Sequence, residues 1–225
     1  MRGEGFFNWP APYVQEFLGK QKLKLTFIPF AGVTIGYDEY FQLVKSEFEK
    51  LGFEINSIHE AANKEECIAH SEGIVIGGGN TFHLLHELMK YDLLGIIKTM
   101  VQKGTPFIGW SAGANMACPT IKTTNDMPII HPGSFNALDL IPFQINPHFT
   151  DKTIQGHGGE SREMRITEYL KVNQNRRVVG LPEGNLILQK GNSLKLLGSS
   201  DAILFEYNVA PRHLKPGDNI DFLLD

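Results

Sequence analysis

A serine within a run of small residues is the position in this sequence best suited to covalent chemistry. Residues 109–113 read Gly-Trp-Ser-Ala-Gly and match the pattern G-x-S-x-G. In that pattern the serine occupies a strained turn between a strand and a helix, and small flanking residues let the chain turn tightly. The helix that follows directs free N–H groups toward a developing oxyanion. The pattern therefore predicts Ser111 as a nucleophile, with an ordinary small-residue turn as the alternative.

A glycine-rich turn is the second feature that could do chemistry. Residues 77–80 read Gly-Gly-Gly-Asn and follow a short apolar run. Glycine lets backbone N–H groups approach a ligand closely. The common phosphate-binding patterns fail here, because no lysine or serine follows at the required position. We therefore expect the Gly79 N–H to complete an oxyanion hole with the Ala112 N–H, while a turn needed only for folding is the alternative.

A serine nucleophile needs a base, and eight histidines compete for that role. Three of them, His131, His148 and His157, lie in the loop-rich part of the chain after the serine. His148 follows an apolar stretch and a rigid proline, in the sequence Asn-Pro-His-Phe of residues 146–149. Catalytic groups are commonly carried by loops on a rigid scaffold, so this position favours His148 as the base.

An acidic side chain should orient the imidazole. Asp126 lies in residues 123–128, Thr-Thr-Asn-Asp-Met-Pro, and Glu183 lies between a proline and a glycine at the end of a predicted strand. Most acidic residues are simply solvated, so each could also be an ordinary turn carboxylate. From the residues alone both stay candidates.

The elements that must position these groups alternate between strand and helix. Apolar runs bounded by proline or glycine predict strands at residues 23–29, 53–58, 73–76, 106–109, 178–181 and 186–189. Apolar residues at helical spacing predict helices at residues 37–51, 64–70, 82–89, 93–103 and 162–171. The alternation indicates one α/β domain over residues 1–225, with a mainly parallel sheet and helices on both faces. Residues 120–146 are expected to be loop-rich, and residues 194–197 and 202–205 to form a terminal hairpin.

Composition excludes several classes of protein. The 225 residues are 42% hydrophobic and carry a formal net charge of -4, so no basic footprint for nucleic acid is expected. No apolar run reaches the roughly 18 residues that a membrane span needs, and no signal-peptide core is present, so a cytoplasmic location is expected. Cys67 and Cys118 lack metal-binding spacing and are expected to be buried thiols.

Seven short blocks of sequence together resemble a known family. They follow one another at residues 28–34, 77–82, 109–115, 123–129, 146–149, 159–163 and 181–185. In this combination they resemble peptidase E, the family of α-aspartyl dipeptidases. The resemblance implies a serine peptidase that releases aspartate from Asp-X dipeptides, with a glutamine-amidotransferase-like or flavodoxin-like layout. It implies no metal or cofactor, and a small peptide as the partner of a monomer or homodimer.

The resemblance also implies roles for residues. Ser111 would be the nucleophile and His148 the base. Glu183 is favoured as the imidazole partner, because it sits at a strand end close to the elbow in such sheets. Asp126 would then hold the substrate's amino group.

Arg162 is the candidate for binding the aspartate side chain, because a guanidinium grips a carboxylate with two parallel hydrogen bonds. A surface arginine at a helix start is the alternative. Asn80 and Glu160 are the further candidates for substrate contact.

Three other functions stay open from the sequence. A cyanophycinase-like enzyme acting on aspartyl polymers would share the elbow but is not expected to share the Asn-Asp-Met-Pro block. A general esterase would cleave simple aryl esters, and a non-catalytic binding module would not label at Ser111. One departure from the family concerns residues 1–9, which are polar, glycine-rich and aromatic where an apolar strand is usual, so the first edge of the sheet is uncertain.

Overall fold

The first of two sheets carries the glycine turn and Ser111, the candidate nucleophile. The computed structural model describes residues 7–19, 21–151 and 159–225, which form two four-stranded sheets and a separate hairpin. The first sheet has the order β2-β1-β3-β4, and all its pairs are parallel. Its strands are β1 (Lys24–Ile28), β2 (Glu54–Ser57), β3 (Gly73–Ile76) and β4 (Phe107–Gly109).

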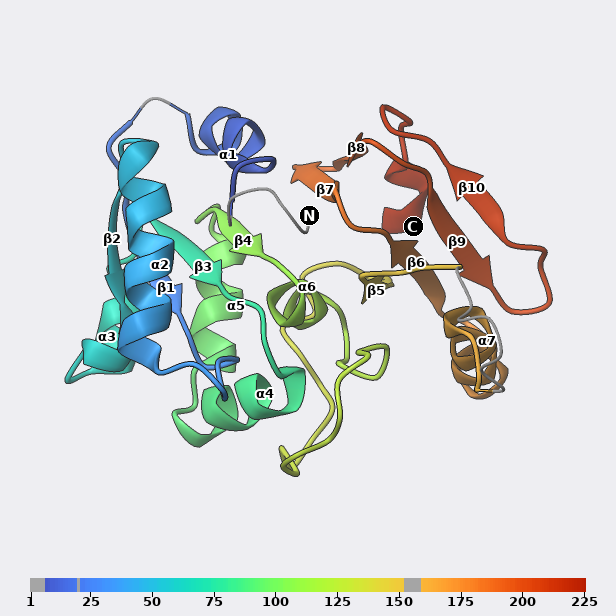
Figure 1. Ribbon diagram of the computed structural model, residues 1–225, viewed down its shortest axis with the longest axis horizontal. Coiled ribbons are helices and arrows are strands. Elements are labelled where there is room, and N and C mark those ends of the chain that lie inside the picture. Colours follow the sequence, from blue (N-terminus) through green and yellow to red (C-terminus); the bar gives the residue numbers. More distant parts are fainter. Residues whose placement is uncertain (1–6, 20, 152–158) are drawn as a thin grey trace.

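Helices cover both faces of this sheet, as Figure 1 shows. On one face lie α1 (Ala11–Leu18) and α2 (Tyr37–Lys50), and on the other α3 (Lys64–Ala69), α4 (Thr81–Lys90), α5 (Leu94–Gln102) and α6 (Ala112–Ala117). Successive residues of a strand point to opposite faces. Val75 accordingly packs in the cluster of α1 and α2, whereas Ile74 and Ile76 pack against the other helices. The predicted mainly parallel sheet with helices on both faces is confirmed.

Polar side chains fix where three of the helices begin. Asn63, Asn80 and Ser161 each accept the backbone N–H of the residue three positions later, at the starts of α3, α4 and α7 (Arg162–Val172). Such a cap stabilises a helix by about 1 kcal/mol and satisfies an N–H that the helix itself leaves unpaired. The cap at Asn80 also sets the direction in which the glycine turn enters α4.

The second sheet carries the histidine and the glutamate. Its order is β10-β9-β6-β5, from β5 (Gln144–Pro147), β6 (Arg177–Leu181), β9 (Ala202–Glu206) and β10 (Arg212–Leu214). β5 and β6 are parallel, while β9 runs antiparallel to both β6 and β10. The helix α7 packs on one face through Ile166 and Leu170. Two short 3-10 turns complete the elements, η1 (Ile58–Glu60) and η2 (Asp221–Leu224).

The predicted terminal hairpin is wrong in its pairing. β8 (Ser193–Gly198) pairs antiparallel with β7 (Asn185–Lys190), and β9 joins the second sheet instead. Lys190 and Ser193 face each other, so the two-residue loop is Gly-Asn, with Gly191 at φ 58°. That dipeptide favours a tight hairpin turn between β7 and β8. β8 therefore pairs with β7 and not with β9, although β9 follows it closely in sequence.

The atypical N-terminal stretch lies partly outside the described residues. From Phe7 the chain forms a turn and then α1, and Phe7, Val14 and Leu18 are buried against the first sheet. Within residues 7–19 and 21–23 the structure contains no strand, so β2 forms the outer edge beyond β1. Among the described residues, no helix has the length and apolar character needed to cross a bilayer.

Cys118 connects the end of α6 to the second sheet as a buried thiol. Its Sγ accepts the Ile145 N–H at 3.2 Å and donates to the Ala114 carbonyl at 3.6 Å. Burial raises the pKa of Cys118 to about 12, and the bond from Ile145 offsets part of that rise. The protonated thiol is thus the form that the fold favours.

Alkaline stability should therefore depend on this thiol. Above about pH 9 the unfolded thiol ionises and the buried one does not, so its contribution is complete below pH 9 and is lost as the pH rises toward 12. We expect Cys118→Ala to remove a slope of about 1.4 kcal/mol per pH unit from the free energy of unfolding above pH 9. Urea unfolding of both proteins from pH 7 to 11 measures the difference. Parallel curves for the two proteins would contradict it.

Candidate catalytic site

Ser111 lies on a strained turn between β4 and α6. Its backbone has φ 54° and ψ -113°, a conformation that non-glycine residues rarely adopt. A Cβ on Gly109 would collide with the Gly113 carbonyl, and a Cβ on Gly113 would collide with the Ile76 carbonyl. Gly109 is therefore needed for the chain to turn tightly on itself, and Gly113 is needed for the turn to pack against β3.

His148 and Glu183 meet Ser111 from the second sheet. His148 Nε2 lies 2.8 Å from Ser111 Oγ, and His148 Nδ1 lies 2.5 Å from Glu183 Oε1. The histidine follows β5 and the glutamate follows β6. Because these strands are parallel neighbours, their carboxyl ends lie at the same edge. With Glu183 ionised, Nδ1–H donates to it and Nε2 accepts the serine proton.

The glycine turn lies directly beside the nucleophile. A Cβ on Gly78 would lie 2.9 Å from Ser111 Cβ, and a Cβ on Gly79 would collide with the Ala31 carbonyl. Gly79 has φ 135°, which only glycine adopts readily. Within the described part of the chain, the N–H groups of Gly79 and Ala112 have no hydrogen-bond acceptor. Both N–H groups are thus unpaired within the described residues, as the predicted oxyanion hole requires.

Asp126 contacts α4 instead of the imidazole. Its Oδ2 accepts from Thr81 N at 2.8 Å, from Thr81 Oγ1 at 2.5 Å and from Thr124 Oγ1 at 3.0 Å. A carboxylate at a helix N-terminus is stabilised by the free N–H groups there. Of the two acidic candidates, the structure brings Glu183 to His148.

Arg162 is a half-buried cation at the start of α7. Its Nη1 is buried and has no hydrogen-bond partner among the described residues. Burial lowers the pKa of the guanidinium and repulsion from Arg165 adds to this, whereas Asp126 raises it. A buried N–H without an acceptor is costly, and none of the described residues supplies one, so this guanidinium is suited to donate to the carboxylate of a ligand.

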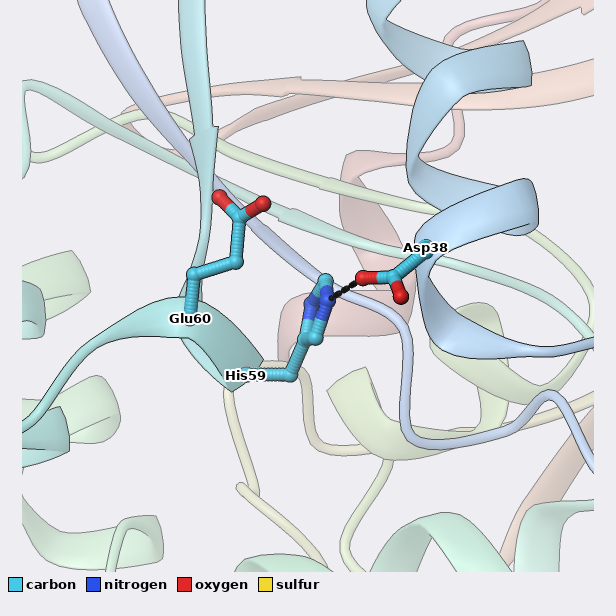
Figure 2. Close-up of side chains that lie close together, drawn as sticks. All are labelled: Asp38, His59 and Glu60. Carbon is cyan, nitrogen blue, oxygen red and sulfur yellow. Dashed lines mark hydrogen bonds and ion pairs between the residues drawn. The ribbon is translucent and has the colours of Figure 1, made fainter.

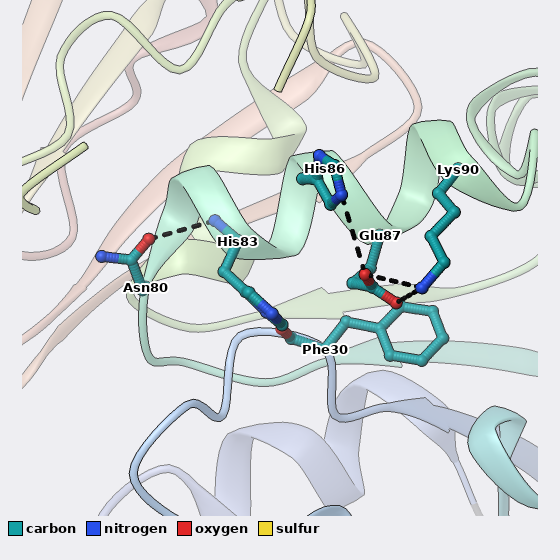
Figure 3. Close-up of polar contacts among 6 residues, drawn as sticks. All are labelled: Phe30, Asn80, His83, His86, Glu87 and Lys90. Carbon is teal, nitrogen blue, oxygen red and sulfur yellow. Dashed lines mark hydrogen bonds and ion pairs between the residues drawn. The ribbon is translucent and has the colours of Figure 1, made fainter. Parts of the chain in front are cut away.

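The two further substrate candidates have structural partners of their own. Figure 3 shows the Asn80 side chain capping α4 through the His83 N–H, and its Nδ2 donates to the Met127 carbonyl at 2.9 Å. Glu160 is exposed and lies 3.7 Å from Arg165 Nε, a weak surface pair. Contact of either residue with substrate stays a prediction.

The remaining histidines near the site have other surroundings. His131 is exposed, and its Nδ1 accepts the Gly133 N–H at 3.1 Å. His157 lies outside the described residues. On α4, His83 donates to the Phe30 carbonyl at 2.7 Å, and His86 faces Glu87, which is paired with Lys90 (Figure 3).

One group of side chains in the described ranges has the spacing of a metal site. The ligand atoms of Asp38, His59 and Glu60 lie within 4.8 Å of one another (Figure 2). His59 already bonds Asp38 at 2.8 Å and the buried Ser57 at 2.5 Å. His59 and Glu60 follow β2, which is three strands from β4 in the sheet order, and Asp38 lies at the start of α2, so the group is separate from Ser111 and its partners.

The sequence did not identify Tyr40 as a residue near the site; it lies within the helix predicted at residues 37–51. The Tyr40 hydroxyl donates to the Gly78 carbonyl at 3.1 Å, so the side chain reaches the glycine turn. A tyrosine on the apolar face of a predicted helix could have indicated such a contact, because a buried phenol needs a hydrogen-bond partner.

Comparison with known proteins identifies the family of the chain. The model of Peptidase family S51 matches residues 2–197. The chain is 46% identical over 223 residues to Peptidase E of Nostoc sp., covering 99% of this chain and 92% of the relative. It is 48% identical over 200 residues to Peptidase E of a Shewanella species, covering 89% and 84%.

A solved structure supports the fold. A Listeria monocytogenes protein assigned as a peptidase E superimposes with a TM-score of 0.68 at 24% identity, covering 87% of this chain and 96% of that one. The family match spans most of the chain and the relatives cover nearly all of it. The chain therefore belongs to peptidase family S51, as its resemblance to peptidase E implies.

Proposed function

We propose that this peptidase hydrolyses Asp-X dipeptides through an acyl-enzyme on Ser111. Family membership supports peptide hydrolysis. The serine mechanism is supported by the bonded series Ser111–His148–Glu183 and by the strained turn that presents the hydroxyl.

The reaction begins when Ser111 Oγ attacks the scissile carbonyl and His148 Nε2 takes its proton. Glu183 stabilises the imidazolium that forms, and the N–H groups of Gly79 and Ala112 bind the oxyanion. The imidazolium then protonates the leaving amine of residue X, which leaves an aspartyl ester on the serine. Water, deprotonated by His148, attacks this ester and releases aspartate, so the free serine is restored.

One observation carries the substrate assignment: the buried Arg162 Nη1 without a partner in the described residues. An aspartate side chain would supply the missing acceptor with two parallel bonds. Asp126 provides the opposite charge close by, and its Oδ1 is not used by Thr81 or Thr124. A cation and an anion in this arrangement match the side-chain carboxylate and the free α-amino group of an N-terminal aspartate.

A dipeptide panel tests the proposal. Release of leucine is measured from Asp-Leu, Asn-Leu, Leu-Leu and N-acetyl-Asp-Leu. We expect Asp-Leu to be cleaved at least about 100-fold faster than the others in kcat/KM, because each of them leaves a charged group of the site unpaired. Equal rates for Asp-Leu and Leu-Leu would refute the specificity.

Arg162→Leu should damage Asp-Leu hydrolysis selectively. We expect a loss of about 100-fold or more in kcat/KM for Asp-Leu and a much smaller change for Leu-Leu, since only the former needs the guanidinium. Arg165→Leu, one turn along α7 and mostly exposed, is the matched control and should retain the preference. An unchanged Asp-over-Leu ratio in Arg162→Leu would contradict the role.

A further inference from the structure

The Tyr40 hydroxyl bonds the glycine turn that carries one of the two proposed oxyanion donors. Tyr40 lies on α2, is 6% exposed and donates to the Gly78 carbonyl at 3.1 Å. Trp110, whose indole N–H can only donate, lowers the pKa of the same phenol and directly precedes Ser111. The buried hydroxyl therefore bonds the glycine turn and has the elbow residue Trp110 as a neighbour.

Close packing holds the Tyr40 ring in this position. It meets Phe27 edge to face, with ring centroids 5.1 Å apart, and Phe27 stacks on Trp110 at 6.1 Å. A Cβ on Gly77 would lie 2.5 Å from the Tyr40 oxygen, so glycine at that position is what admits the phenol. The hydroxyl thus has little freedom to choose another partner.

The Gly78 carbonyl and the Gly79 N–H belong to one planar peptide group. A hydrogen bond donated to the carbonyl fixes the plane of that group, and it polarises the N–H on the other side. We propose that Tyr40 is a positioning residue that orients and strengthens the Gly79 N–H as an oxyanion donor. The inference rests on the proposed acyl-transfer function. It adds a residue that does not touch the substrate but holds one donor of the oxyanion hole in position.

The proton on the phenol is retained under ordinary conditions. Burial raises the pKa of Tyr40 to about 12, although the bonds with Trp110 and the Gly78 backbone offset part of that rise. Below that value the hydroxyl keeps its proton and can donate.

Tyr40→Phe tests the inference, because it removes the hydroxyl and keeps the ring. We expect kcat for Asp-Leu to fall about 10- to 100-fold with KM changed less than about twofold, which is less than the loss of a direct donor. An aspartyl aldehyde, which forms a tetrahedral adduct on Ser111, should bind weaker by the same factor. Tyr37→Phe, one turn earlier on α2 and half-buried, is the control and should leave both values unchanged.

A purely structural role predicts another pattern, in which lower activity follows only from a smaller folded fraction measured by thermal unfolding. A wild-type kcat in Tyr40→Phe, or a rise in KM at unchanged kcat, would overturn the inference. The rate at which a fluorophosphonate labels Ser111 tests the role of Tyr40 independently of the proposed dipeptide specificity. If no Asp-X dipeptide is cleaved, slower labelling in Tyr40→Phe than in Tyr37→Phe still supports Tyr40, and equal labelling rejects it.

Discussion

Ser111→Ala is expected to lower kcat for Asp-Leu at least about 10⁴-fold and to leave the fold intact. The substitution removes the attacking oxygen, so only oxyanion stabilisation and binding remain to accelerate hydrolysis. Alanine keeps the small volume that the turn requires beside Gly78 and carries the same backbone strain as serine. Leucine release gives the rate, and circular dichroism with thermal unfolding gives the state of the fold.

Ser46→Ala provides the matched control. Ser46 lies on the exposed side of α2, and among the described residues its hydroxyl bonds only the Leu43 carbonyl of its own helix. This variant should keep wild-type kinetics. If Ser111→Ala retained turnover within tenfold of the wild type, a serine acyl-enzyme at this position would be ruled out.

Glu183→Gln is expected to lower kcat about 10³- to 10⁴-fold with little change in KM. A glutamine amide can donate to His148 Nδ1, which places the imidazole proton on Nε2, the nitrogen that must accept from Ser111. The side chain stays the same size and is largely exposed, so stability should change little. Steady-state kinetics with Asp-Leu measure the effect.

Asp126→Asn gives the complementary result for the other acidic candidate. Because Asp126 bonds α4 and acts on Arg162, its loss should raise KM for dipeptides with a free amino group more than it lowers kcat. The reverse pattern, a severe kcat loss in Asp126→Asn and a mild one in Glu183→Gln, would make Asp126 the imidazole partner.

The elbow could be predicted from sequence because its cause is local. Small residues on both sides of Ser111 are what the turn demands, and the apolar run before it supplies the strand. The cap at Asn80 is equally local. The role of His148 as a candidate base could also be predicted from its position after a strand and a proline, because the end of a strand fixes the side chains that follow it.

Other features depend on contacts between distant segments. The residues alone left Asp126 and Glu183 open, since the choice follows from the parallel pairing of β5 with β6. Burial of Arg162 Nη1 exists only once α7 has packed on the second sheet. Tyr40 follows the helical apolar pattern like any core residue, and its contact with Gly78 arises from the packing of α2 on the first sheet.

Ser111 and His148, the proposed nucleophile and base, follow strands of different sheets, so the distance between them is set by the junction of those sheets. Buried amide and hydroxyl groups fasten that junction, since Asn115 Nδ2 and Thr123 Oγ1 both donate to the Ile145 carbonyl at 2.9 Å. A tilt of one sheet against the other would separate the hydroxyl from the imidazole while each stayed correctly folded on its own support. In the proposed mechanism, proton transfer from Ser111 to His148 therefore depends on these junction contacts, and a substitution that loosens them should lower activity without changing Ser111, His148 or Glu183.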